Sequence, residues 1–255
     1  EKKIFNWKKR IKELKKLLDK YKSKNNNFDC LVPVSGGKDG SYVSYILKHK
    51  YGMRPLAITS RPPLTLKVGN QNLENFVRSG YDHMHITPDE NVMRRFNKEG
   101  FIHMGFPYYG WLVSIYSVVT NISLSLKIPL IFYGENGEVE YGGNLKKNTS
   151  KVSLKEIKRV FLEDGYKKVY WFTLPESKEK NFHITHWSYF EPWDPYRNYL
   201  VAKEKCNLTE KNETNFGTFT NFAQTDQALY DLHTYIMYLK FGFGRATDQL
   251  SYLIR

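Results

Sequence analysis

The stretch that decides the fold is DCLVPV (29–34) followed by SGGKDGS (35–41). An apolar strand runs into a glycine turn, and the turn runs into a helix whose apolar residues recur at helical spacing. Backbone N–H groups at a helix start favour anions, and adjacent glycines let the main chain approach a phosphate without a Cβ in the way. The stretch therefore predicts a cradle for nucleotide phosphates.

Two charged side chains give this cradle its chemistry. Lys38 can neutralise a phosphate, and Asp39 can hold a magnesium ion against it. The spacing is not that of a Walker A loop. It resembles the SGGxDS signature of the PP-loop ATP pyrophosphatases, which cleave ATP between its α and β phosphates and leave an adenylated substrate. Gly40 stands where that signature has its last serine, which leaves open whether Ser41 replaces the hydroxyl.

Apolar runs alternate with helical patterns along the chain, as is typical of an α/β protein with a parallel sheet covered on both faces. We expect a basic amphipathic helix in 1–28. A Rossmann-like, five-stranded domain of the adenine nucleotide alpha hydrolase type should follow in 29–255, with an insertion or lid at about 144–181. The expected strands are 29–34, 55–59, 83–87, 129–133 and 182–188, and the expected helices are 40–51, 69–79, 91–98, 109–126 and 225–239.

Composition limits the class of protein. With 39 Lys and Arg against 26 Asp and Glu, the formal charge of +13 predicts anionic partners. Much of this excess lies in the first helix, where a solvated face on a docked helix is favoured over a nucleic-acid arm. No apolar run approaches the ~20 residues of a membrane span and no leader is visible, so we expect a cytoplasmic protein. Because the chain starts at Glu1 and ends in a helical pattern, we also expect truncation at both ends.

Three strand ends carry polar residues. In parallel sheets, ligands bind beyond the carboxyl ends of the strands, so the three ends should converge on one pocket. The cradle follows the first strand, Thr59 and Arg61 follow the second, and a glycine-rich acidic turn begins at Gly134 after the fourth. Arg61 is available for a phosphate, although a surface position is an equal alternative. The acidic turn needs a cation, an ammonium or a sugar hydroxyl between it and a phosphate, unless it is simply solvated.

Two later motifs, HWSYFEPWDPYRNY (186–199) and KFGFGRATDQ (240–249), are more specific than a glycine loop. Together with SGGKDG (35–40), FYGEN (132–136) and EYG (140–142), they make nearly the whole chain resemble the bacterial N-acetyl sugar amidotransferases of the PP-loop superfamily. Members act in surface polysaccharide and nonulosonic acid biosynthesis, where they convert an acetamido group of a UDP-linked sugar into an acetamidino group. They commonly carry a cysteine-rich zinc element before the basic helix, so zinc is expected only in a segment preceding these residues.

The resemblance implies ATP and Mg²⁺ as cofactors. Its expected catalytic residues are Lys38, Asp39, Glu135 and Glu140, with Glu140 preferred for orienting ammonia and taking up its proton. The expected ATP and pyrophosphate ligands are Ser35, Gly36, Gly37, Lys38, Asp39, Gly40, Ser41, Thr59 and Gly134. The expected substrate ligands are Arg61, Asn136, Tyr189, Glu191, Trp193, Arg197, Arg245 and Asp248. Aromatic core filling is the alternative for the first motif, and helix capping is the alternative for the last.

The nucleophile must come from elsewhere. Neither Cys30 nor Cys206 lies in a glycine-flanked nucleophile turn, so we expect separate glutaminase and ammonia-channel subunits that resemble imidazole glycerol phosphate synthase. A tRNA-modifying PP-loop enzyme would use the positive charge directly, but its sulfur-transferring branch needs catalytic cysteines. A nucleotide-binding sensor without chemistry is the third alternative.

Overall fold

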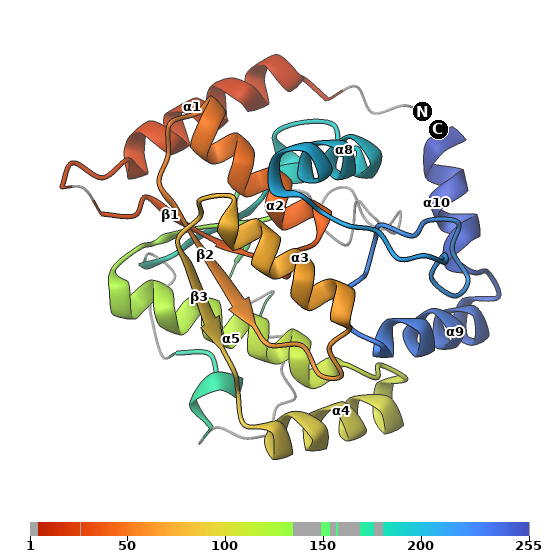
Figure 1. The fold of residues 1–255 in the computed structure, drawn as a ribbon. Helices are drawn as coiled ribbons and strands as arrows, with labels where there is room; N and C mark the ends of the chain where they lie inside the picture. The colour runs from red at the N-terminus through yellow and green to blue at the C-terminus, as the bar shows by residue number, and fades with distance from the viewer. Residues whose placement is uncertain are drawn as a thin grey trace.

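The computed structural model describes residues 5–25, 27–134, 149–153, 157, 169–175 and 181–254, with side chains up to residue 251. Five parallel strands form one sheet in the order β3-β2-β1-β4-β5 (Figure 1). They are β1 (Cys30–Pro33), β2 (Pro55–Ser60), β3 (His83–Ile86), β4 (Leu130–Tyr133) and β5 (His183–His186). The predicted five-stranded parallel α/β fold is confirmed.

Helices cover both faces of this sheet. The described helices are α1 (Trp7–Tyr21), α2 (Lys38–Tyr45), α3 (Lys67–Arg78), α4 (Glu90–Met104), α5 (Tyr109–Leu126), α8 (Pro195–Cys206), α9 (Leu229–Phe241) and α10 (Arg245–Ile254), with the short helices η1 (Ile46–Lys50), η3 (Tyr170–Phe172) and η5 (Trp187–Tyr189). The helix expected over 40–51 begins earlier, at Lys38, and becomes π-helical after Tyr45. The helix expected from residue 225 begins only at Leu229.

Alternate residues of the strands build a core on each face. Cys30 and Val32 of β1 pack in one cluster with residues of α1, α2 and α8. Leu31, between them, packs in a second cluster with residues of α5. All three side chains are wholly buried, as expected for a strand covered on both sides. Leu14 and Leu18 of α1 belong to the first cluster, so the basic N-terminal helix is docked on the core.

The apolar helix α5 lies inside the fold. By length and composition it could cross a membrane, but 61% of it is buried among the other elements. Val118, Val119 and Ile122 pack against residues of β1, β2 and β4 in the second core cluster. We therefore read α5 as a core helix; no other helix in the described ranges is long and apolar enough to cross a membrane.

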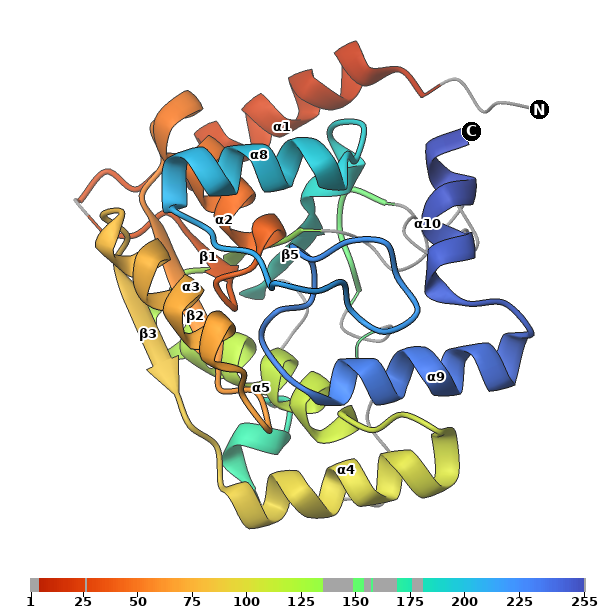
Figure 2. The same cartoon turned by 45° about the vertical axis from the view of Figure 1, so that its right-hand side comes forward.

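The segment that joins α8 to α9 returns to the carboxyl ends of the strands, passing beside α3 (Figure 2). Gln227 forms an antiparallel bridge with Thr65, just after β2. The N–H of Leu66 donates to the carbonyl of Asp226 at 3.1 Å. A Cβ on Gly69 would lie 2.6 Å from the Cα of Asp226, so only glycine permits this approach. The C-terminal part of the chain is thereby fixed beside the first glycine turn.

We expect stability to depend on the protonation of His186 in β5. Burial lowers the pKa of His186 to about 4 from its ordinary 6.5. Between these values the unfolded chain binds a proton that the folded chain does not, so the free energy of unfolding should fall as pH decreases from 6.5 to 4. This group contributes up to roughly 3 kcal/mol of that loss.

Urea unfolding of the wild type and His186→Gln at pH 7 and pH 4.5 measures this contribution. The variant should lose less stability than the wild type over that interval. An equal loss in the two proteins would contradict the assignment.

Candidate functional site

The turn between β1 and α2 has the geometry of an anion cradle. Gly36 has φ +82°, and a Cβ there would overlap the backbone nitrogen of Leu73 in α3 and lie 2.7 Å from its Cα. Gly37 is the N-cap of α2, with an extended backbone and no side-chain cap. Because the first N–H groups of an α-helix lack intrahelical partners, this start of α2 is suited to an anion.

Gly40 explains why the signature departs from SGGxDS. A Cβ at this position would lie 2.9 Å from the carbonyl oxygen of Pro33 and 3.1 Å from the Cα of Val34, so a serine would force the turn apart. Ser41 does not replace its hydroxyl. The Ser41 side chain is wholly buried, its Oγ has no hydrogen-bond partner, and it is not among the residues that line the cavity at the cradle. Ser41 therefore lies outside the cradle cavity, and its contact with ATP stays a prediction.

The cradle opens into a cavity of about 290 Å³, here called the cradle cavity. Its polar wall consists of Ser35, Gly37, Lys38, Asp39, Gly40, Ser60, Gly134, Gln224, Thr225 and Asp226. Its other wall carries the apolar and aromatic side chains of Tyr108, Trp111, Ile115, Val119 and Tyr133. The indole of Trp111 donates to the carbonyl of Ser60 at 2.8 Å, which fixes the ring at the end of β2. Aromatic and apolar side chains in a cavity beside an anion cradle suit a nucleotide.

A second cavity, of about 550 Å³, adjoins the first. Its lining is Lys38, Asp39, Trp193, Asp194, Pro195, Tyr196, Phe219, Thr220, Phe222, Ala223, Gln224, Tyr230, Arg245, Asp248 and Gln249, and we call it the aromatic cavity. Lys38 and Asp39 line both cavities and form an ion pair in which each side chain is less than one-fifth exposed. Asp39 Oδ1 accepts from Asn198 Nδ2 at 3.0 Å. The two cavities therefore meet at one partly buried ion pair.

Three predicted substrate residues lie together in the aromatic cavity. Trp193 is 6% exposed. A Cβ on Gly134 would lie 3.2 Å from the edge of the Trp193 ring. The absence of a side chain at Gly134 therefore lets the chain just after β4 come close to Trp193. Arg245 is also 6% exposed and forms an ion pair with Asp248. A buried arginine at the end of an aromatic cavity is suited to an anionic group of a ligand.

Glu191 and Arg197, two of the predicted substrate ligands, connect helices. Glu191 Oε1 accepts hydrogen bonds from the Tyr42 hydroxyl and the Trp187 indole, each at 2.6 Å. Arg197 donates to the same oxygen at 3.1 Å, and its guanidinium lies 4.7 Å from the centroid of the Tyr42 ring. Neither residue is among those lining the two cavities. This network fastens α2 to α8 through Glu191 Oε1.

Tyr189, another predicted substrate ligand, also lies outside the two cavities and contacts the N-terminal helix. Its hydroxyl donates to Glu13 of α1 at 2.9 Å, and the guanidinium of Arg10 lies 4.1 Å from the centroid of its ring. Arg10 also donates to the Tyr189 carbonyl at 2.9 Å. Tyr189 thus attaches the N-terminal helix, which explains an aromatic residue at this place without a ligand.

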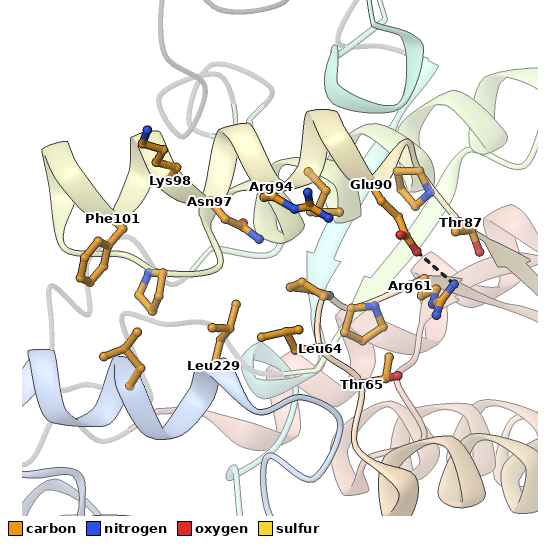
Figure 3. A pocket seen from close by; sticks show the side chains of 16 residues that line it. Arg61, Leu64, Thr65, Thr87, Glu90, Arg94, Asn97, Lys98, Phe101 and Leu229 are labelled. Carbon is orange, nitrogen blue, oxygen red and sulfur yellow. Dashed lines mark ion pairs between the residues drawn. The ribbon is translucent and has the colours of Figure 1, made fainter.

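Thr59 and Arg61, at the end of β2, lie outside the cradle cavity. The Thr59 hydroxyl donates to the carbonyl of Val34 at 2.7 Å and lies 2.8 Å from His83 Nε2. It therefore connects β2 both to the residue after β1 and to the first residue of β3. Arg61 forms an ion pair with Glu90 at 3.4 Å, and both line a separate cavity of about 640 Å³ between α4 and α9 (Figure 3). The structure thus does not bring Thr59 and Arg61 to the cradle cavity, and their contacts with ATP and with substrate stay predictions.

Asp226 is the residue that the sequence interpretation missed. It lines the cradle cavity, is 8% exposed, and its Oδ1 has no hydrogen-bond partner among the described residues. Burial raises the pKa of Asp226, while a hydrogen bond from Ser35 and the charge of Lys38 oppose that rise. Residues 225–239 were expected to form one helix; the signal against this is the run NFAQTDQ (221–227), which has no helical spacing.

Glu135, Asn136 and Glu140 lie outside the described residues, as does most of the expected lid, so their roles stay predictions. In the described part of the chain, no group of three or more His, Cys, Asp or Glu side chains could hold a metal ion. Magnesium usually binds proteins through one or two carboxylates together with substrate phosphates. The carboxylates of the cradle cavity, one with an unpartnered buried oxygen, fit an ion that arrives with a nucleotide.

Comparison with known families gives one match. The family described as "LPS biosynthesis protein WbpG-like, C-terminal domain" matches residues 216–255. This range contains Asp226, Arg245 and Asp248. A search of curated proteins found no sequence that matches the chain.

Solved structures show a distant likeness. NH3-dependent NAD synthetase from Campylobacter jejuni is 16% identical over 55% of this chain and 62% of its own, with a TM-score of 0.39. U34-tRNA thiolase NcsA from Methanococcus maripaludis is 13% identical over 91% of this chain and 75% of its own, with a TM-score of 0.46. A predicted subunit of tRNA methyltransferase from Methanocaldococcus jannaschii is 15% identical over 86% of this chain and 90% of its own, with a TM-score of 0.40. Likeness at this level concerns the course of the backbone, so no function is carried over from it.

The two adjacent glycines of the cradle should differ sharply in their tolerance of a methyl group. Gly36→Ala combines a positive φ with backbone overlap, so we expect it to lower the free energy of unfolding by about 2 kcal/mol or more. Gly37→Ala meets nothing nearer than Ser35 Oγ at 3.5 Å and should cost less than about 1 kcal/mol. Urea unfolding of both variants tests this; equal losses would mean that the turn does not pack on α3 as described.

Proposed function

We propose that this chain is an ATP-dependent, AMP-forming amidotransferase of the PP-loop type. Its substrate would be a UDP-linked N-acetyl sugar, whose acetamido oxygen is replaced by ammonia to give an acetamidino sugar, AMP and pyrophosphate. The observation that carries the proposal is the meeting of the cradle cavity and the aromatic cavity at Lys38 and Asp39. Adenylation needs such an arrangement, because the acceptor oxygen must reach the α-phosphorus of ATP.

The aromatic cavity supports an acceptor of the size and chemistry of a nucleotide sugar. A volume of about 550 Å³ falls within the usual range for small-molecule sites. Tyr196, Phe222 and Tyr230 line it and offer faces on which a base or a sugar ring can stack. Arg245 supplies a buried positive charge for a diphosphate. These groups are complementary to the three parts of the proposed substrate.

The reaction solves a leaving-group problem. An amide carbonyl reacts poorly with ammonia, because its oxygen would have to leave as oxide. The amide oxygen first attacks the α-phosphorus, the bond from that phosphorus to the bridging β-oxygen breaks, and pyrophosphate departs. Ammonia then adds to the carbon of the adenylated imidate and loses a proton. AMP leaves with the former amide oxygen, and the amidine remains.

The chain's own residues would stabilise the departing pyrophosphate. Lys38 and the first N–H groups of α2 face the place where negative charge grows, and charge stabilisation of this kind is usually a large part of catalysis. Asn198 fixes the carboxylate of Asp39, which would hold magnesium. The ion would neutralise phosphate charge when the nucleotide is bound.

The family match supports the choice of substrate class, because the WbpG-like C-terminal domain is named for LPS biosynthesis and its range includes Arg245 and Asp248.

The cysteines support a separate source of ammonia. Both thiols are wholly buried. Burial raises the pKa of Cys206 to about 11, and it raises the pKa of Cys30 even more. Neither is suited to hydrolyse glutamine. We therefore propose a glutaminase and an ammonia-channel subunit as partners.

Incubation with α-labelled ATP, ammonium salt and UDP-N-acetyl sugars should give AMP and pyrophosphate in step with the amidine, detected by mass spectrometry. Asp39→Asn should lower kcat/KM by about 100-fold, while Glu213→Gln, at an exposed carboxylate, should not change it. Formation of AMP only with tRNA would support the tRNA-modifying alternative, and nucleotide binding without AMP in either mixture would support a sensor; both would overturn the proposal.

The source of ammonia can be tested with the same chain. We expect amidine formation with ammonium salt but none with glutamine alone, because neither buried thiol can attack the glutamine amide. Release of glutamate by the isolated chain, abolished in Cys206→Ser, would show that the glutaminase resides in this chain after all.

A further inference from the structure

We propose that Asp226 is a second carboxylate ligand, beside Asp39, for the divalent cation that accompanies the nucleotide. The inference rests on the proposed function and deepens it. It assigns a cation-binding role to a residue that lies nearly 190 positions after the cradle motif, in the segment between α8 and α9.

The first argument is the state of the Asp226 carboxylate. The residue is 8% exposed and lines the cradle cavity, yet Oδ1 has no hydrogen-bond partner among the described residues. Buried carboxylate oxygens are normally paired, because leaving one without a partner costs free energy. A carboxylate retained only for folding would be expected to have both oxygens satisfied. An unpartnered buried oxygen on a residue that lines a cavity is what a ligand bound in that cavity would explain.

The second argument is how firmly the carboxylate is placed. The backbone of Asp226 accepts from the N–H of Leu66, and the next residue, Gln227, pairs with Thr65. Gly69 allows the start of α3 to come against the Asp226 backbone. These contacts hold Asp226 on a rigid support instead of an exposed loop, which is what a metal ligand requires.

The third argument is the charge balance of the cradle cavity. Lys38 pairs with Asp39, and its ammonium also lies close enough to Asp226 to act on that carboxylate. Without nucleotide, the Lys38 ammonium is therefore shared by the carboxylates of Asp39 and Asp226. When phosphates enter, Lys38 is drawn to them, and the two carboxylates would repel the phosphates unless a cation joins them. Two carboxylates with phosphate oxygens and waters form a usual magnesium environment.

The test uses Mn²⁺ as a paramagnetic probe for magnesium and α,β-methylene-ATP as a nucleotide that cannot be cleaved between its α and β phosphates. Titrations followed by electron paramagnetic resonance compare the wild type, Asp226→Asn and Glu213→Gln, whose exposed carboxylate lies on the same segment. We expect Asp226→Asn to weaken Mn²⁺ binding to the nucleotide complex by about tenfold or more. Glu213→Gln should leave it within about twofold, because its carboxylate is solvated.

Two further measurements separate metal binding from a structural role. In EDTA, the nucleotide analogue should bind Asp226→Asn as well as it binds the wild type, or better, because a negative charge has been removed from the cavity. Without ligands, Asp226→Asn should unfold at the same temperature or a higher one, because a buried carboxylate has been replaced by an uncharged group of the same shape. A variant that loses stability and analogue binding together would assign Asp226 a structural role and overturn the inference.

The outcomes also distinguish the two proposals. If the wild type binds the analogue with Mn²⁺ and Asp226→Asn binds Mn²⁺ equally well, only the role of Asp226 is refuted. If the wild type binds no analogue under any condition, the cradle is not a nucleotide site, and the proposed function fails together with this inference.

Discussion

The backbone contact between Gly36 and Leu73 is the constraint on which the rest of the site depends. It forces the turn after β1 into a left-handed conformation and sets α3 against it. α2 then begins just after β1, at the carboxyl end of a strand that lies beside β4 in the sheet. Lys38 and Asp39, at that helix start, line both the cradle cavity and the aromatic cavity.

A second close approach brings the C-terminal segment to the same place. Because Gly69 has no side chain, the backbone around Asp226 comes against α3 just after β2. The two cavities therefore combine residues from both ends of the chain, and Gln224 lines both. The ion pair of Lys38 and Asp39, held by Asn198 of α8, forms the boundary between them.

Local patterns made the sheet and the cradle predictable. Strand and helix periodicities and adjacent glycines act over a few residues, so β1, β2 and the turn could be located from the sequence. The orientation of Thr59, Glu191 and Arg197 could not, because each depends on a partner in another part of the chain. That partner is His83 for Thr59 and Tyr42 for both Glu191 and Arg197. Asp226 was missed for the same reason: only the folded chain shows a carboxylate there without a partner.

The wall shared by the two cavities has a consequence for ligand design. A compound that carries an adenylate at one end and a sugar at the other would extend past Lys38 and occupy both chambers at once. Since it brings the two halves together in one molecule, it loses translational freedom only once on binding. The architecture thus favours hybrid inhibitors over separate analogues of either half.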